Sequence, residues 1–105
     1  MSVYVTLRVP VDPAAFEAAV AERADVIERI MEIAKGKGLI GHRWLRGEHE
    51  VMAVDEWPDA ESFQAFFEEG GPEIGPLMAA AGVTGEPEVT VWGHVAIDDV
   101  FGWGA

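Results

Sequence analysis

The stretch from Val51 to Phe67, VMAVDEWPDAESFQAFF, constrains the fold more than any other part of the chain. It begins as an apolar strand and is interrupted at Trp57-Pro58-Asp59. Asp59 then stands where a helix N-cap belongs, because its carboxylate can accept hydrogen bonds from the free N–H groups of the first turn. The helix that follows has one apolar face, formed at i, i+3, i+4 spacing by Phe63, Phe66 and Phe67. A strand leading directly into such a helix predicts an α+β layer, in which the helix packs on the sheet.

The other segments complete this layer in the order β-α-β-β-α-β. Alternating apolar residues predict the first strand, and Asp12-Pro13 is typical of a helix start. The expected elements are a strand at Ser2–Val9, a helix from Pro13 to Gly36 or Gly38, strands at Leu39–Arg46 and Glu50–Trp57, a helix from Asp59 to a break at Gly70-Gly71-Pro72, a short helix at Pro76–Ala81, and a strand at Val89–Ala96. This order is the ferredoxin-like α+β pattern. We expect residues 1–105 to form a single domain around one core.

The charge of the chain disfavours several classes of partner. The net charge is −12, and all seven Lys and Arg residues fall within the first 46 residues. Nucleic acid and anionic membranes are poor partners for such a surface. No apolar run approaches the roughly 18 residues needed to span a bilayer, and no secretory leader is evident, so we expect a cytoplasmic protein. Without cysteine there is no thiol nucleophile, and the spacing of the three His does not favour a metal site, so we expect no metal.

The alternation of side chains between the two faces of each strand predicts which residues face the helices. The expected helix-facing set is Val3, Val5, Leu7, Met52, Val54, Val89 and Val91. The expected uncovered set is Tyr4, Thr6, Arg8, His42, Trp44, Val51, Ala53, Asp55, Trp57, Thr90, Trp92 and His94. Three tryptophans are costly to leave in water, so we expect a second copy to cover this face in a homodimer. The aromatic residues either fill that interface or line a small-molecule pocket, and the residue types leave both readings open. The tail Ile97–Ala105, with Phe101 and Trp103, also suggests docking on a partner.

Three residues are candidates for acid–base catalysis. His42 and His94 could exchange protons near neutral pH and deprotonate a phenol or enol. The alternative for each is a structural hydrogen bond at an interface or a strand end. Asp55 is costly on an apolar strand unless it is paired, so it is either a salt-bridge partner of Arg8 or Arg43 or a catalytic base.

Three segments together resemble the antibiotic biosynthesis monooxygenase-like (dimeric α/β-barrel) family. They are V-D-E-W-P-D-A-E-S-F-Q-A-F, G-P-L-M-A-A-A-G-V and P-E-V-T-V-W, and the resemblance covers nearly the whole chain. It implies a ferredoxin-like fold whose dimers close into a barrel, with one pocket between sheet and helices in each subunit. It further implies oxygenation of a small polyketide-type aromatic or quinol without a cofactor. Trp57 matches the strand-end aromatic residue that often borders the pocket in this family.

The same resemblance leaves other activities open. Haem-degrading relatives use an Asn on the first strand and a His on the helix after the Trp, whereas this chain has no Asn and no His in Ala60–Ala81. The alternatives are a non-oxidative isomerase, cyclase or lyase on the same scaffold, and a non-catalytic dimer that binds a small hydrophobic molecule. The candidate catalytic residues are His42, His94 and Asp55. The candidate substrate-binding residues are Trp57, Trp44, Trp92, Tyr4, Arg8, Phe63 and Phe67.

Overall fold

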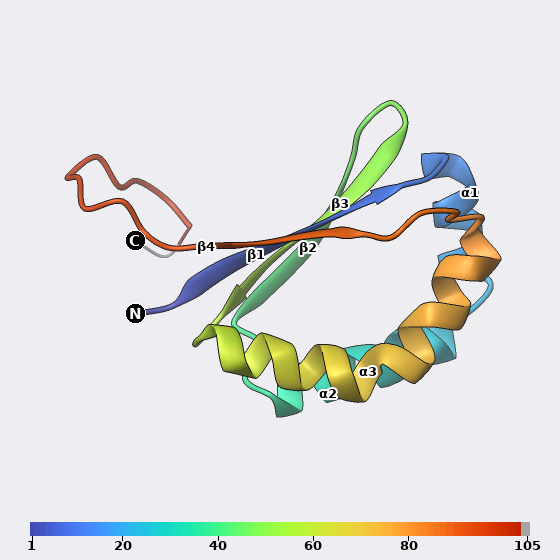
Figure 1. The fold of residues 1–105 in the computed structure, drawn as a ribbon, viewed down its shortest axis with the longest axis horizontal. Helices are drawn as coiled ribbons and strands as arrows, with labels where there is room; N and C mark the ends of the chain where they lie inside the picture. Colours follow the sequence, from blue (N-terminus) through green and yellow to red (C-terminus); the bar gives the residue numbers. More distant parts are fainter. Residues whose placement is uncertain (104–105) are drawn as a thin grey trace.

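The computed structural model describes residues 1–103, and the part of the predicted tail formed by Gly104 and Ala105 lies outside the described residues. Seven elements follow one another along the chain (Figure 1). They are β1 (Val3–Pro10), α1 (Pro13–Ala21), α2 (Ala24–Gly36), β2 (Gly41–Arg46), β3 (Glu50–Trp57), α3 (Ala60–Ala81) and β4 (Glu88–Trp92). The strand predicted at Glu50–Trp57 has the bounds of β3, whereas β4 ends at Trp92 and leaves His94 outside the strand.

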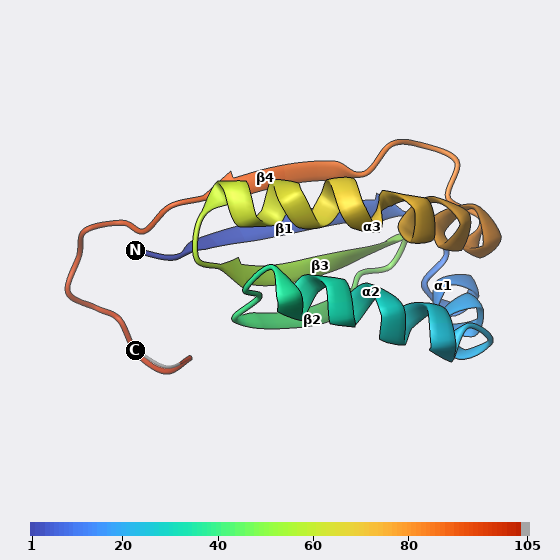
Figure 2. The ribbon, with the colours of Figure 1, turned by 90° about the horizontal axis from the view of Figure 1, so that it is seen from below.

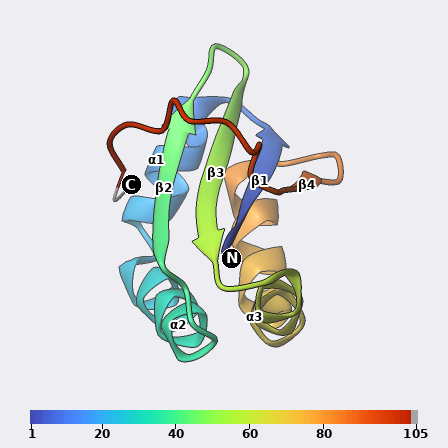
Figure 3. The ribbon, with the colours of Figure 1, turned by 90° about the vertical axis from the view of Figure 1, so that its left-hand side faces the viewer.

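The four strands form one antiparallel sheet in the order β2-β3-β1-β4. All three helices lie on one side of this sheet, and α2 and α3 run side by side beneath it (Figures 1 and 2). The predicted ferredoxin-like α+β fold is therefore confirmed. Seen from the end, the helices form one layer and the strands the other, and no helix of residues 1–103 covers the second face of the sheet (Figure 3).

Two groups of buried side chains hold the layers together. Around α1, the buried Phe16 packs with Val9, Val51 and Met78. Nearer the other end, Val5 and Ala34 pack with the aromatic side chains of Trp57, Phe63 and Phe66. Trp57 is completely buried, so the strand-to-helix segment that begins at Val51 supplies the largest side chain of the core.

The first long helix is broken, which the periodicity did not predict. α1 ends at Ala21 and α2 begins at Ala24, with the backbone of Arg23 at φ −129° and ψ 44°. The Arg23 guanidinium donates to the carbonyl of Ala19 at 3.1 Å, which satisfies a free acceptor at the end of α1. The break lets α1 and α2 bury their apolar faces against different parts of the sheet.

The last helix is continuous, so the predicted break at Gly70-Gly71-Pro72 is wrong. α3 runs unbroken through both Pro72 and Pro76. The helix has buried residues along its whole length, from Phe63 near its start to Ala81 at its end. Tertiary packing of this face therefore outweighs the low helix propensity of the Gly- and Pro-rich segment.

The predicted N-cap of this helix is confirmed. The backbone N–H of Ser62 donates to Asp59 Oδ1 at 2.7 Å. Hydrogen bonding with the side chain and the backbone of Ser62 holds the pKa of the Asp59 carboxyl below its usual value. The cap fixes the point at which the chain leaves the sheet and returns beneath it as α3.

The strand register reverses the predicted faces of β2 and β3. Asp55 pairs with Val5 and with His42, and Ala53 pairs with Leu7 and with Trp44. Residues paired across an antiparallel sheet share a face, so these side chains all lie on the helix side. Val51 and Trp57 also face the helices, and Met52 and Val54 face away. The prediction was correct for β1 and for Val89 and Val91 of β4.

No helix among residues 1–103 is long and apolar enough to cross a membrane.

Candidate functional site

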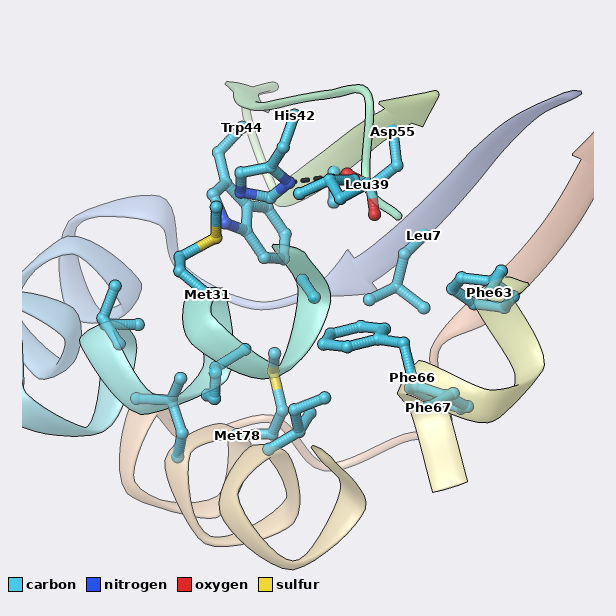
Figure 4. Close-up of a pocket in the computed structure, with 16 residues that line it drawn as sticks. Leu7, Met31, Leu39, His42, Trp44, Asp55, Phe63, Phe66, Phe67 and Met78 are labelled. Atoms are coloured by element: carbon cyan, nitrogen blue, oxygen red, sulfur yellow. Dashed lines mark hydrogen bonds and ion pairs between the residues drawn. The ribbon is translucent and has the colours of Figure 1, made fainter. Parts of the chain in front are cut away.

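A cavity of about 80 Å³ lies between the helix side of the sheet and the helices α2 and α3. His42 and Trp44 of β2 and Asp55 of β3 form its sheet-side wall, and Phe63, Phe66 and Phe67 of α3 lie across from them (Figure 4). The remaining lining residues are Leu7, Ile27, Ile30, Met31, Ala34, Leu39, Ala53, Ile74, Leu77 and Met78. A mostly apolar cavity with a few convergent polar groups is what small-molecule sites look like.

The polar groups of the cavity form a His–Asp pair. His42 Nδ1–H donates to Asp55 Oδ1 at 2.6 Å, and only 23% of the His42 side chain and 11% of the Asp55 side chain are exposed. An ionised carboxylate can only accept hydrogen bonds, so this contact assigns the proton of the neutral imidazole to Nδ1. Nε2 is then left as a proton acceptor, which is the arrangement of an oriented general base.

Trp57 holds the other oxygen of the same carboxylate. Its indole N–H donates to Asp55 Oδ2 at 3.3 Å, so both oxygens of the buried Asp55 have a donor. The ring itself packs against Phe66 and Phe63, with centroids 5.3 and 6.0 Å away. Trp57 therefore lies behind Asp55 and is not among the residues that line the cavity. The predicted salt bridge of Asp55 with Arg8 or Arg43 is wrong, because β3 turns Asp55 to the other face.

Flexible side chains limit the size of the cavity. Its volume is smaller than the roughly 150 Å³ of an engineered apolar cavity that accepts one benzene ring. Met31 of α2 and Met78 of α3 project into the same space (Figure 4). Methionine has three rotatable bonds and repacks at small cost, so an aromatic ligand can enlarge the cavity by displacing these two side chains.

Four of the candidate site residues lie away from the cavity. Arg8 donates to both oxygens of Glu50 at 2.9 Å, and this pairing raises the pKa of Arg8 and lowers that of Glu50. Trp92 donates its indole N–H to Thr6 Oγ1 at 2.8 Å on the uncovered face. Tyr4 and His94 contact each other, with their ring centroids 5.6 Å apart. The structure thus separates His94 from His42.

Four aliphatic residues of the helical wall of the cavity were not among the candidate site residues. Ile27, Ile30 and Met31 of α2 and Ile74 of α3 line it. Their spacing shows only that they belong to apolar helix faces, and cavity-lining residues share that pattern with ordinary core residues. Within residues 1–103, no group of three or more His, Cys, Asp or Glu side chains is placed to hold a metal ion.

Comparison with known proteins finds likeness in structure only. No protein-family model matches the chain, and no curated protein matches its sequence. The solved structures that match include SnoaB, a cofactor-independent oxygenase from Streptomyces nogalater (19% identity, 94% of this chain and 98% of that chain covered, TM-score 0.64). They also include the monooxygenase ActVA-Orf6 of Streptomyces coelicolor in complex with nanaomycin D (19% identity, coverage 94% and 93%, TM-score 0.65).

A third matching structure is a dimeric ferredoxin-like protein from an uncultured marine organism, with 16% identity, 95% and 93% of the two chains covered, and a TM-score of 0.66. All three matches span nearly the full length of both chains, and the likeness at this level of identity is one of fold. The chain therefore has a ferredoxin-like fold in common with these three proteins.

Proposed function

We propose that this protein is a cofactor-independent, monooxygenase-like enzyme that acts on a small aromatic, polyketide- or quinol-type molecule. The observation that carries the proposal is the His42–Asp55 hydrogen bond at the wall of an otherwise apolar cavity. Two of the matching structures are oxygenases, which supports the same class of reaction.

The chemistry requires little beyond an oriented base and a dry cavity. His42 Nε2 takes the proton of a phenol or enol, and the resulting anion is rich enough in electrons to react with O2 directly. A carbon–oxygen bond forms, and the peroxide anion takes back the proton from His42 to give a hydroperoxide. Loss of one water then leaves a quinone from a phenol or a dicarbonyl compound from an enol, so the substrate itself supplies the electrons. Asp55 stabilises the protonated imidazole and keeps it oriented. Trp44 and the phenylalanines of α3 hold the aromatic ring.

A titration of tryptophan fluorescence tests whether the cavity binds such molecules. We expect planar quinols and hydroxylated aromatic compounds to quench the fluorescence saturably, near one molecule per chain. Replacing Trp44 with Phe removes the indole at the cavity wall and should reduce the quenching. Trp92→Phe is the matched control, because its indole lies on the other face of the sheet.

Oxygen uptake then separates the possible reactions. Consumption of O2 with a bound quinol supports the oxygenase, and turnover without O2 uptake assigns the same base to an isomerase, cyclase or lyase. Binding without any turnover indicates a non-catalytic binding protein. If no aromatic compound gives a saturable response, the cavity is core packing and the proposal is wrong. Saturable haem binding would instead support the haem-degrading branch.

We further propose that two copies of this chain pair through the uncovered face of the sheet. Leu45 and Trp92 on this face are 46% and 52% exposed, and Met52 and Val54 lie between them. An open hollow of about 830 Å³ lies on the same side, lined in part by Leu45, Val54 and Trp103. Apolar surface left open on one face of a sheet favours burial against a partner, and a two-fold dimer is the commonest form. A matching structure is itself dimeric.

A charge at the centre of this face should break the dimer. We expect Val54→Asp to shift the mass measured by sedimentation from two chains to one at micromolar concentration, because burying a carboxylate in the interface is costly. Ala80→Asp is the matched control, since Ala80 is exposed on α3, away from this face. A wild-type protein that sediments as a single chain at high micromolar concentration would refute the pairing.

A further inference from the structure

The charge of the cavity wall restricts which substrates the site can take. Among the 16 lining residues, only His42 and Asp55 can carry a charge. The wall is otherwise built from the side chains of Leu, Ile, Met, Ala, Trp and Phe. No lining residue is a Lys or an Arg, which are the usual partners of a substrate carboxylate.

The His–Asp pair cannot supply the missing positive charge. Asp55 is held as an acceptor by His42 and by Trp57, at 2.6 and 3.3 Å. With a neutral imidazole the pair carries one negative charge, and with a protonated imidazole its two charges cancel. Neither of these two states gives the pair a net positive charge, and a second carboxylate beside Asp55 would be repelled by the first.

Two cations, Arg29 of α2 and Lys37 directly after this helix, are already paired with acids of α3. Arg29 Nε lies 3.0 Å from Glu73 Oε1, and Lys37 Nζ lies 3.2 Å from Glu69 Oε1. The chain as a whole carries a net charge of −12. The long-range field of such a protein repels anions from its clefts.

We propose that the cavity selects an uncharged phenol or enol and rejects the same ring system when it bears a carboxylate. This inference rests on the proposed function, because it takes the cavity as the substrate site. A carboxylate moved into an apolar cavity loses its hydration without gaining a partner, whereas a neutral hydroxyl can donate to His42 Nε2. The specificity thus follows from the absence of a Lys or Arg side chain in the cavity wall and from the position of His42, its one proposed base.

Calorimetric titration with three matched ligands tests the inference at neutral pH. The ligands are naphthol, a hydroxynaphthoic acid and the methyl ester of that acid, which differs from it mainly in charge. We expect naphthol and the ester to bind and the acid to bind at least about 100-fold more weakly than the ester, given the cost of desolvating an unpaired carboxylate. The ester controls for size, because it is larger than the acid.

A cation placed at the rim should reverse this preference. Phe67 lines the cavity and is 36% exposed, so a long side chain at this position can reach both the cavity and water. We expect Phe67→Arg to raise the affinity for the acid relative to the ester at least about tenfold, by providing the missing partner. Phe67→Gln, which removes the ring without adding charge, should leave the ratio as in the wild type.

The outcomes distinguish this inference from the proposed function. If the acid binds the wild-type protein within about threefold of the ester, the charge selection is wrong, whereas the cavity remains a binding site. If none of the three ligands binds, the proposed function fails and the inference falls with it. A Phe67→Arg variant that binds the ester but shows no gain for the acid would also overturn the charge argument.

Discussion

Replacing His42 with Gln is expected to lower kcat for the oxygenation by about 10²- to 10⁴-fold, the usual contribution of a positioned general base. Gln can still donate a hydrogen bond to Asp55 from its amide, so the carboxylate keeps a partner and the fold is retained. What is lost is Nε2, the nitrogen that takes the substrate proton. Oxygen uptake and product formation at saturating substrate measure the effect, and the affinity for the substrate should change much less than kcat.

Two further histidines provide matched controls for this prediction. His94 contacts Tyr4 at the opposite face of the sheet, and His49 is exposed in the turn between β2 and β3. We expect His94→Gln and His49→Gln to leave kcat within about threefold of wild type, because surface substitutions away from a site are close to neutral. A His42→Gln variant with full turnover would show that the His42–Asp55 pair is structural.

The second large effect is expected on stability. Trp57→Ala should lower the free energy of unfolding by about 3–5 kcal/mol, since truncation of a large buried aromatic residue loses its packing and leaves a cavity. Trp57 has no exposed surface and packs against both Phe63 and Phe66. The substitution also removes the donor to Asp55 Oδ2, which leaves a buried acceptor with one partner fewer. Total stabilities are about 5–15 kcal/mol, so a large share would be lost.

Denaturant unfolding followed by circular dichroism measures this loss. Phe67→Ala is the control from the same aromatic group, because Phe67 stacks on Phe63 at 5.5 Å but is 36% exposed. We expect this control to cost less than about 2 kcal/mol, in proportion to the smaller area that it buries. Equal losses for the two variants would contradict the central place of Trp57 in the core.

Much of the fold could be predicted from the sequence because its strongest signals are local. The alternation of β1, the Asp59 cap and the phenylalanine spacing of α3 each depend on residues close together in the chain. The two errors in the helices have a common cause. Neither the break at Arg23 nor the continuity of α3 through Pro72 is set by local propensity, because both depend on the surface that each helix packs against.

The site was only partly predictable, because a face assignment depends on the register between strands. Val51 to Val54 are all apolar, so β3 shows no alternation that could distinguish its two faces. Side-chain alternation along β3 therefore predicts Asp55 on the uncovered face once Met52 and Val54 are assigned to the helix side. In the structure two hydrogen bonds satisfy it on the buried side, and the partner that allows this, His42, comes from a neighbouring strand.

The two walls of the cavity differ in stiffness. The sheet wall is held by the pairing of β3 with β1 over eight residues and with β2 over six. The helix wall contains Pro72 and Pro76, each of which removes one backbone hydrogen bond from α3, along with glycines that cost about 1 kcal/mol of helix propensity each relative to Ala. A bound molecule will therefore deform α3 before it moves the strands. His42 therefore stays fixed on the sheet while α3 adapts to the shape of the bound ring. The same reaction can thus take place on ligands of several shapes.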